Sequence, residues 1–509
     1  MLLLLLACTG GPDPLPEPPP ELLSEPEPSP VEAAPVLTAV GDVGPDRAVL
    51  WVRASGYNRV WATVDAGAAT WRSEDAPVRT AADFTATLPI TGLPPGQTLR
   101  YALRGSTTAP PDEGELLAEG TFTTAPASDA AAPVKLAVMG DLGGQGYCRP
   151  AEGGYGILGA IADRAPDVVI ANGDLIYADG DCPARAPDGI ANLPGDFPAI
   201  AEPWVDWTDA RRVREVFDAH WRYNRSDPNF IRLTEVAPLI AQWDDHEVIN
   251  DFGAPWDAWH TRDPERAGYT TLVEVGRAAF FDWNPITPHP DEPHRVYRSF
   301  RWGRHLEVFI VDGRSYRSPN PQPDGPEKTL LGAAQRDWLT QAVAASDATW
   351  KVISVDVPIS IPSGSQAWKA GRDGWANGVG DPTTPEGEED RSVATGYEAE
   401  LTGILDAWQA KGVDGVVFVT TDVHFSQTLR YTRTGGFTFH EVVSGPLRAW
   451  MGEPGPLDPT FGPTSLYAES GVPTFAWLEL SADGQSLSVA TCGPDGQPRP
   501  GSALTLKAE

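Results

Sequence analysis

Two patterns of apolar positions occupy the chain, and they change at a low-complexity joint, residues 125–133. After the joint, continuous apolar runs of four to six residues alternate with longer helical or irregular stretches. Such runs are typical of α/β domains, in which both faces of a largely parallel sheet are covered. The six runs that matter below are 134–139, 168–171, 238–241, 306–311, 350–355 and 416–420. We therefore predict an α/β domain over residues 134–509.

The segment before the joint, residues 36–126, shows short bursts in which apolar and polar positions alternate. Examples are 48–53, 59–64 and 99–103, and they are separated by turns that contain Gly and Pro. Several short strands at this spacing predict a small β-sandwich. The closing segment GTFTT is similar to the last strand of a fibronectin-III-like module. We expect an all-β N-terminal domain over residues 36–126 that braces the following domain.

An acidic residue stands shortly after each of the six apolar runs. The positions are Asp141, Asp174, Asp244 with Asp245, Asp312, Asp356 and Asp422. Ligands of α/β sheets bind at the carboxyl ends of the strands, so these segments can converge on one place. A single Asp after a strand often only caps a helix or turn, but six in one chain are hard to assign to capping. Several carboxylates packed together resist joint ionisation unless cations neutralise them, so the pattern indicates bound metal.

The motifs around these residues resemble those of the calcineurin-like metallophosphoesterases, a group that includes the purple acid phosphatases. They read MGDLGG, NGDLIYAD, QWDDHEVIND, VDGRSYR, SVDVP and TTDVH in chain order. Three positions depart from the purple acid phosphatase pattern: Asp245 replaces an Asn, and Asp356 and Asp422 each stand where a His is usual. These departures make the chain more similar to the alkaline phosphatase D (PhoD-like) branch.

Two further segments match that branch, YNRSDP at 223–228 and KTLLGAAQRDWL at 328–339. Together with the β-rich N-terminal segment, the resemblance covers roughly residues 36–446. It implies a two-sheet metallophosphoesterase-like sandwich flanked by helices.

The resemblance implies two or more metal ions with different ligands. The ligands expected at the first ion are Asp141, Asp174, Tyr177 and His424. A phenolate and carboxylates suit a hard trivalent ion, and the resemblance implies iron(III). Ordinary core packing is the alternative for Tyr177.

The ligands expected at the second ion are Asp174, which bridges both ions, and Asp245, Asp356 and Asp422. An all-oxygen shell suits calcium, magnesium or manganese better than zinc. The resemblance favours calcium, or another hard divalent ion, at this site.

The resemblance also implies hydrolysis of phosphomonoesters, phosphodiesters or both, with a metal-bridging hydroxide as nucleophile. Asp245 and His246 are the expected catalytic residues, because His246 can stabilise or protonate the departing oxygen. Asn250 and Arg314 are the expected donors to the phosphoryl oxygens. A structural ion pair remains the alternative for Arg314, and a bond to a backbone carbonyl remains the alternative for His246.

The N-terminal residues differ in composition from the rest of the chain. Residues 1–8, MLLLLLAC, are similar to a lipoprotein-type signal whose Cys8 becomes lipidated. Residues 9–35 are rich in Pro and Glu and predict an extended linker. Later apolar runs are shorter than the roughly 18 residues of a spanning helix. We expect an exported protein, periplasmic or on the cell surface, attached to the membrane only through Cys8; an apolar N-terminus without function is the alternative.

The net charge of −32 argues against nucleic acid as a partner, because docking on a phosphate backbone needs clustered cations. We expect a monomer that acts on a phosphate ester. Three cysteines follow Cys8, and a disulfide between Cys148 and Cys182 is plausible because each follows one of the motifs. Some PhoD-like proteins bind iron through a Cys soon after the first strand, but Cys148 lies too far beyond Asp141 for us to expect this here.

Two other functions stay open. One is a phospholipase-type phosphodiesterase that acts on lipid or wall-polymer substrates. The other is a lipoprotein that only binds phosphate or a partner. Residues 181–233 separate two motif strands and contain several aromatic residues, so we expect a wall or lid over the metals with a small core of its own.

Overall fold

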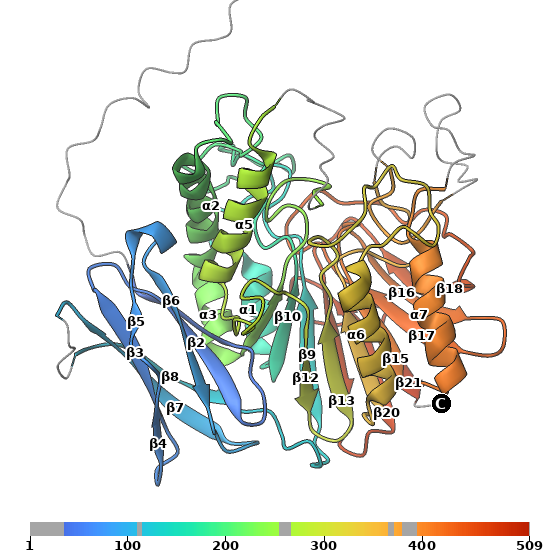
Figure 1. Cartoon of the computed structure of the whole chain (residues 1–509), viewed down its shortest axis with the longest axis horizontal. Coiled ribbons are helices and arrows are strands. Elements are labelled where there is room, and N and C mark those ends of the chain that lie inside the picture. The colour runs from blue at the N-terminus through green and yellow to red at the C-terminus, as the bar shows by residue number, and fades with distance from the viewer. Residues whose placement is uncertain (1–34, 109–113, 254–265, 365–370, 379–393, 508–509) are drawn as a thin grey trace, which may run out of the picture. The chain divides into compact units, whose positions relative to one another are not determined.

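Two large β-sheets hold the strands that the six apolar runs predict (Figure 1), as seen in a computed structural model of the chain. The structure describes residues 35–108, 114–253, 266–364, 371–378 and 394–507. The predicted signal segment with Cys8, and all of the predicted linker except Pro35, lie outside these residues. Within the described ranges, no helix is both long and apolar enough to cross a membrane.

The first sheet has nine strands. In spatial order they are β21 (Leu504–Lys507), β20 (Ser486–Cys492), β19 (Phe475–Leu480), β9 (Val134–Met139), β10 (Val168–Asn172), β11 (Leu239–Gln242), β1 (Leu37–Gly41), β2 (Arg47–Arg53) and β6 (Thr85–Thr91). Strands β9, β10 and β11 run parallel, so their carboxyl ends lie along the same edge.

The second sheet has seven strands. In spatial order they are β12 (Arg298–Trp302), β13 (Leu306–Ile310), β14 (Trp350–Ser354), β15 (Val416–Thr420), β17 (Thr438–Val443), β16 (Ser426–Thr432) and β18 (Pro463–Glu469). Strands β13, β14 and β15 are parallel to one another. Each of the six predicted runs is therefore a strand, three in each sheet.

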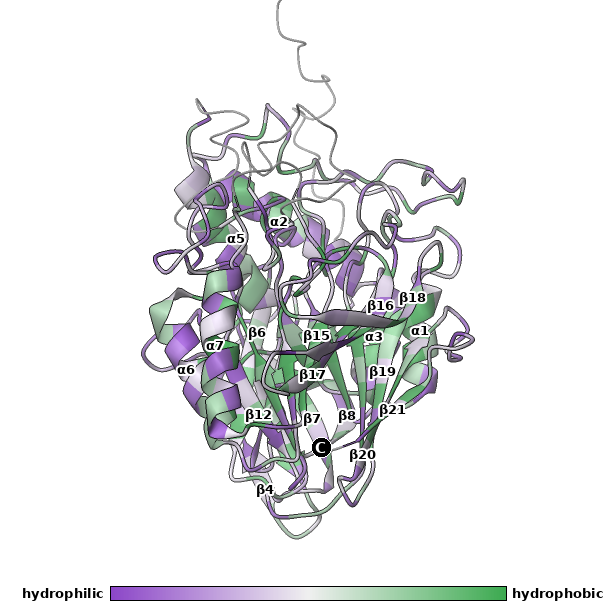
Figure 2. Ribbon diagram, turned by 90° about the vertical axis from the view of Figure 1, so that its right-hand side faces the viewer, coloured by the Kyte–Doolittle hydropathy of each residue, from purple (hydrophilic) through white to green (hydrophobic). Residues whose placement is uncertain are grey.

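Alternating side chains of the second sheet enter two different cores. In β13, Val308 belongs to the core shared with the first sheet, whereas its neighbour Phe309 packs in a core on the other face. That outer core also contains Leu339 and Leu405, which come from helices α6 (Gly332–Ala345) and α7 (Glu398–Lys411). Because neighbouring residues of a strand point to opposite faces, a continuous apolar run is what a sheet covered on both sides requires. In Figure 2, which colours residues by hydropathy, the strands of the sheets are largely hydrophobic.

The remaining helices accompany the first sheet. Within the part of the chain that the structure describes, they are α1 (Gly156–Asp163), α2 (Ala210–Arg225), α3 (Pro228–Val236) and α5 (Tyr269–Trp283), together with a 3₁₀ turn at Thr80–Ala82. Helix α1 packs against α3, and α2 packs against α5. Asp227 caps the start of α3, because its carboxylate accepts hydrogen bonds from two backbone N–H groups of the first turn. Pro228 is the first helical residue, a position where a backbone N–H has no partner within the helix.

The N-terminal strands belong to two sheets, one of which also contains strands of the following α/β segment. A five-stranded sheet contains β4 (Thr70–Arg72), β3 (Arg59–Asp65), β7 (Thr98–Ser106) and β8 (Glu115–Thr123), and β5 (Ala76–Pro77) pairs with β3. Strands β1, β2 and β6 instead extend the nine-stranded sheet, because β1 pairs with β11 in parallel. Residues from Pro35 to Glu509 form one compact unit. The expected fibronectin-III-like domain is therefore not confirmed.

Candidate metal centre

The loops after the strands bring acidic and histidine side chains together in three groups. The groups are Asp141 with Asp174 and His424, Asp174 with Asp245 and His246, and Asp245 with Asp251 and Asp373. Within each group the candidate ligand atoms lie within 4.8 Å of one another, and all of these residues are buried. Asp174 belongs to the first two groups and Asp245 to the last two, so the three groups form one continuous centre.

An unusual backbone conformation marks several of these residues. Asp141, Asp174, Asp422 and His424 have φ angles of 58°, 53°, 74° and 60°. This left-handed region costs most residues on the order of 1–3 kcal/mol, although Asp tolerates it because its short polar side chain can bond locally. Gly173 contributes to one of these turns, because a Cβ at this position would lie 2.5 Å from the Cβ of Asp244. The strand-to-loop turns are therefore shaped to aim the side chains inward.

The first group contains the residues predicted to bind the trivalent ion. The hydroxyl of Tyr177 lies 2.9 Å from Nε2 of His424, and the same nitrogen is 3.8 Å from Oδ1 of Asp141. Burial lowers the pKa of His424 to about 4, so its imidazole is neutral and able to bind a metal. Burial, together with the charges of Asp174 and Asp141, raises the pKa of Tyr177 well above its usual value. A phenolate at Tyr177 therefore needs a nearby cation.

Buried carboxylate oxygens without hydrogen-bond partners show that the centre fits cations. Among the described residues they include Oδ2 of Asp141, Oδ1 of Asp245 and Oδ2 of Asp422. Burial raises the pKa of Asp141 to about 8, and burial also raises the pKa of Asp174 and Asp422. An unpaired buried carboxylate is strongly unfavourable unless it is protonated or neutralised by a cation. Oxygen atoms of this kind are the ligands that hard metal ions prefer.

His246 is held by a carboxylate that the sequence reasoning did not single out. Its Nδ1 lies 2.6 Å from Oδ1 of Asp179, whose other oxygen accepts a hydrogen bond from the backbone N–H of Asn250. Burial would lower the pKa of His246, but the charges of Asp179, Asp245 and Asp174 raise it well above its usual value. A protonated His246 at the edge of an acidic centre can donate a proton or a hydrogen bond to an anion.

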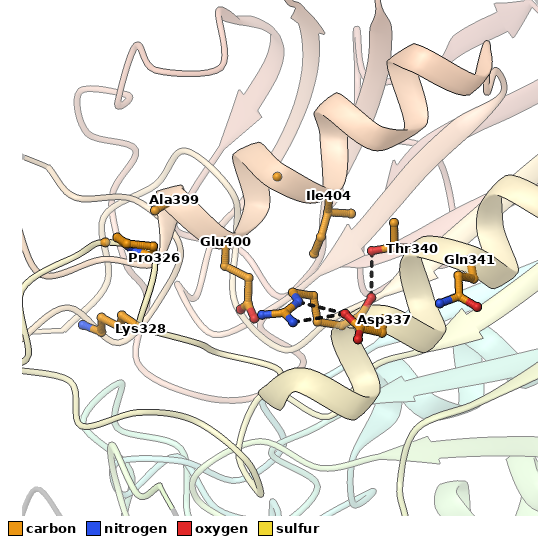
Figure 3. Close-up of a pocket in the computed structure, with 11 residues that line it drawn as sticks. Pro326, Lys328, Asp337, Thr340, Gln341, Ala399, Glu400 and Ile404 are labelled. Carbon is orange, nitrogen blue, oxygen red and sulfur yellow. Dashed lines mark hydrogen bonds and ion pairs between the residues drawn. The ribbon is translucent and has the colours of Figure 1, made fainter.

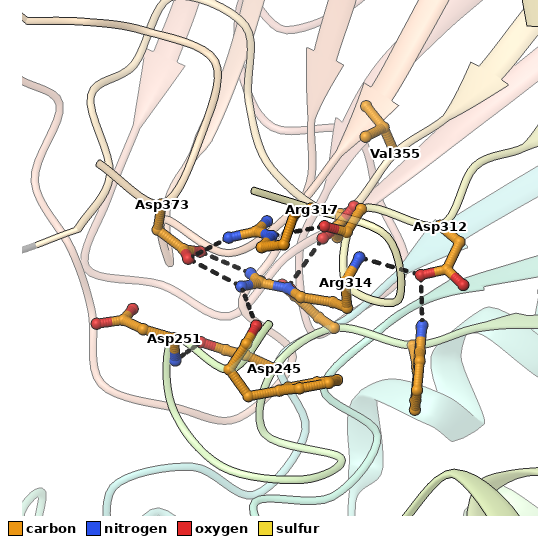
Figure 4. A network of polar contacts seen from close by, with 12 residues as sticks. Asp245, Asp251, Asp312, Arg314, Arg317, Val355 and Asp373 are labelled. Carbon is orange, nitrogen blue, oxygen red and sulfur yellow. Dashed lines mark hydrogen bonds and ion pairs between the residues drawn. The ribbon is translucent and has the colours of Figure 1, made fainter. Parts of the chain in front are cut away.

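Arg314 lies behind the metal-binding groups, in the network of Figure 4. Its side chain is fully buried, and its guanidinium lies 2.5 Å from Asp244, 3.0 Å from Asp356 and 2.7 Å from Asp373. Burial works against ionisation of Asp373, but Arg314 and Arg317 lower its pKa. This placement does not support the predicted contact of Arg314 with substrate, because three carboxylates already occupy its guanidinium. The structure thus contains the structural ion pair that was the alternative for Arg314.

The predicted ligands of the second ion are only partly brought together. Asp174 and Asp245 share a group, and Asp422 lines the same cleft. Asp356 is fully buried, faces Arg314 and belongs to none of the groups found among the described residues. Its assignment as a ligand remains a prediction; both of its carboxylate oxygens lack a hydrogen-bond partner, and Oδ2 is the one that faces Arg314.

A cleft of about 720 Å³ opens onto the centre. The residues that line it include Asp174, Asp245, His246, Asn250, Asp422 and His424. Its remaining lining includes apolar side chains on the loops after β15 and β17. The cleft therefore gives a ligand access to at least one residue of each metal-binding group, whereas Asp141, Asp373 and Arg314 do not line it.

Two residues of the matched motifs, Asn224 and Glu247, hold the loops that carry the candidate ligands. Asn224 donates hydrogen bonds to the carbonyl oxygens of Leu142 and Leu175, in the loops of Asp141 and Asp174. Glu247 is fully buried and accepts hydrogen bonds from the N–H groups of Asp174 and Leu175. The matched segments thus contribute rigidity to the centre.

Cys148 and Cys182 form a disulfide, which confirms the pairing considered from the sequence. The bond joins the loop after β9 to the loop after β10, so it links the segments that carry Asp141 and Asp174. The aromatic residues of segment 181–233 do not form the small separate core that we expected: Trp207 and Trp221 are buried in the large core that also contains the strands of the first sheet, whereas Trp204 is exposed.

A second cavity, of about 360 Å³, lies between α6 and α7 (Figure 3). Its polar groups bond within the protein: Glu400 accepts hydrogen bonds from backbone N–H groups of the preceding loop, and Arg336 pairs with Asp337. None of the three metal-binding groups found among the described residues lies there. The chemistry belongs to the cleft after the strands.

Three site residues escaped the sequence reasoning. Asp179 lies in the NGDLIYAD motif and could have been considered, because an acidic residue near a predicted catalytic His is a candidate to orient it. Asp251 ends the QWDDHEVIND motif, whereas Asp373 lies in an irregular segment without any periodic pattern. Only the folded chain brings Asp373 beside Asp245.

Comparisons with known proteins agree with this geometry. A sequence family described as PhoD-like phosphatase matches residues 136–486. Alkaline phosphatase D of Bacillus subtilis (strain 168) is 26% identical over 231 residues, which cover 42% of this chain and 35% of that protein. The match thus spans about a third of that relative's length.

Two solved structures share the fold. A structure of PhoD has a TM-score of 0.69 at 18% identity, and the match covers 92% of this chain and 88% of the other. A purple acid phosphatase from yellow lupin (Lupinus luteus) seeds has a TM-score of 0.58 at 14% identity, with 93% and 74% covered. At these identities the likeness concerns the fold, an α/β sandwich of mixed sheets.

Proposed function

The chain belongs to the PhoD-like phosphatase family, and we propose that it is a metal-dependent phosphoesterase that hydrolyses phosphomonoesters, phosphodiesters or both. The observation that carries the proposal is the set of buried carboxylate oxygens without partners at the meeting point of the three groups. Cations neutralise such oxygens and at the same time attract an anionic ester. A protein that shares only the fold of a phosphatase need not contain such unpaired carboxylate oxygens.

Asp141, Asp174, Tyr177 and His424 would hold one ion, for which we propose iron(III), because a phenolate and carboxylates suit a hard trivalent cation. Asp174, Asp245, Asp422 and Asp356 would hold a second ion, for which we propose calcium or another hard divalent cation. Bound ions would lower the pKa of a coordinated water toward neutrality and neutralise phosphoryl oxygens.

The protein's own residues then handle the leaving group and the orientation of the ester. His246 lines the cleft, and Asp179 stabilises its protonated form. A proton on the ring can therefore pass to the departing alkoxide, which would otherwise leave as a poor anionic group. Asn250 would donate from its amide to a phosphoryl oxygen; its position in the lining of the cleft, with its backbone N–H bonded to the other oxygen of Asp179, supports this role.

The test is turnover of p-nitrophenyl phosphate and bis(p-nitrophenyl) phosphate by metal-replete protein at several pH values. We expect turnover of at least one ester, a loss of at least about 100-fold in Asp174→Asn, and little change in Asp337→Asn, an exposed Asp outside the cleft. A strong preference for the diester would restrict the function to phosphodiester hydrolysis. Absence of turnover with every ester would support a role in binding alone.

We also propose that the protein is exported and anchored through a lipid on Cys8. The disulfide between Cys148 and Cys182 supports export, since such bonds persist in oxidising compartments. Membrane fractionation of the full chain and of Cys8→Ser tests the anchor. The wild type is expected with membranes and the variant in the soluble fraction; equal distribution of both would refute the anchor.

A further inference from the structure

Trp450 is an exposed aromatic residue at the mouth of the metal centre. Among the tryptophans that the structure describes, only Trp450 and Trp204 are largely exposed, and Trp450 leaves 56% of its surface accessible. Its ring centroid lies 6.3 Å from that of His424. Trp450 lines the cleft together with the candidate metal ligands, whereas Trp204 does not. An indole ring left in water loses the free energy that its burial would contribute, so its position suggests contact with a ligand.

The segment that carries Trp450 is fixed to both metal-binding loops. The N–H of Arg448 donates to the carbonyl of Asp141, and the carbonyl of Arg448 accepts from the N–H of Gly143. On the other side, the N–H of Gly452 donates to the carbonyl of His424. The backbone N–H of Trp450 itself donates to Gln145. The backbone that carries the indole is therefore held at a set position relative to the centre, which lowers the entropy cost of using the indole as a binding surface.

The surroundings of the indole are apolar on one side. Phe425, Ile361, Pro362 and Pro456 line the same cleft as Trp450. The acidic half of the cleft is suited to the phosphoryl group with its cations, whereas these four side chains offer an uncharged, apolar surface. An ester bound with its phosphorus at the metal centre therefore directs its alcohol part toward an apolar wall.

One charged residue limits what this wall can accept. Glu453 also lines the cleft, three residues beyond Trp450, and accepts a hydrogen bond from the hydroxyl of Ser470 at 2.6 Å. A carboxylate here disfavours an alcohol part that carries a negative charge of its own, because like charges repel at short range. A flat, uncharged group meets no such penalty.

We propose that Trp450 is a specificity-determining residue that stacks against a flat, uncharged aromatic or heteroaromatic alcohol part of the phosphate ester. The inference rests on the proposed function and adds the class of ester to it. Aromatic contacts of this kind act over ring distances of about 4.5–7 Å and need a rigid, exposed π face. The indole of Trp450 provides such a face beside the metal centre.

The test compares kcat/KM for 2-naphthyl phosphate and for 2-glycerophosphate in metal-replete protein. Trp450→Ala is expected to lower the value for the naphthyl ester about tenfold more than the value for the glyceryl ester, which corresponds to about 1.4 kcal/mol. Trp450→Phe keeps an aromatic face and is expected to restore most of the difference. Trp204→Ala, the other exposed tryptophan, serves as the matched control and is expected to leave both values unchanged.

Equal losses for the two esters in Trp450→Ala, or no loss for either, would overturn the proposal. If the alanine variant unfolds at a clearly lower temperature than the wild type, Trp450→Leu replaces it, because leucine keeps apolar volume but has no π face. In either variant, the ratio of kcat/KM for the naphthyl ester to kcat/KM for the glyceryl ester decides whether Trp450 selects aromatic alcohol parts. Absence of turnover by the wild type with these two monoesters and with bis(p-nitrophenyl) phosphate would instead refute the proposed function, so the two failures are distinguishable.

Discussion

Replacing Arg314 by Met tests the most heavily buried charge network of the protein. The guanidinium is completely enclosed and is the shared partner of Asp244, Asp356 and Asp373 at 2.5–3.0 Å. Removing one partner of a buried ion pair leaves the other charge uncompensated and costs about 3–5 kcal/mol. Of these three carboxylates, only Asp373 would keep an ion pair with a second arginine, Arg317. We therefore expect Arg314→Met to lower the free energy of unfolding of metal-free protein by at least about 3 kcal/mol.

The assay is urea-induced unfolding of metal-free protein, followed through the shift in midpoint at a fixed slope. Arg336→Met is the matched control, because Arg336 pairs with Asp337 at the surface and such pairs contribute about 0–1 kcal/mol. Arg314→Lys should fall between wild type and Arg314→Met, since it keeps the charge but loses the fork that reaches several carboxylates. A loss below about 1 kcal/mol in Arg314→Met would show that the carboxylates are neutralised in another way.

Three further predictions follow from other parts of the molecule. Replacing Cys148 and Cys182 by Ser should lower the free energy of unfolding by about 3–4 kcal/mol in urea titrations, because the bond closes a loop with a sequence separation of 34; no change would contradict this. Burial raises the pKa of Glu441 from 4.5 to about 7. The folded state thus keeps a proton that the unfolded state loses, and stability should fall by up to about 3 kcal/mol between pH 4.5 and 7. Glu441→Gln should flatten that fall in urea titrations; an unchanged slope would refute the assignment. Tyr177→Phe should abolish visible absorption of iron-loaded protein, and persistence of the band would exclude Tyr177 as ligand.

The strands of the fold could be predicted because each apolar run reflects the burial of its own residues. A run such as 350–355 places Val352 in one core and Ile353 in the other, and burial on both faces is visible in the sequence itself. The pairing of β1 with β11 was not predictable in this way, since it joins residues about 200 positions apart. Periodicity shows that a strand exists but not which strand lies beside it.

The candidate site was predictable where motif and position agree. Asp141, Asp174 and His424 follow strands, and the fold brings them into one group. The placement of Arg314 was not predictable, because a residue after a strand can turn its side chain toward the cleft or behind it. Asp373 and Trp450 lie in irregular segments, where no pattern links them to the centre. Their roles depend on long-range packing alone.

The metal content of the purified, untreated protein tests the central proposal most directly. The proposed ligand sets, with Tyr177 and His424 at one ion and four Asp side chains at the other, predict about one iron and at least one calcium or other hard divalent ion per chain by elemental analysis. Stoichiometric zinc without iron or calcium would contradict the account of both ions.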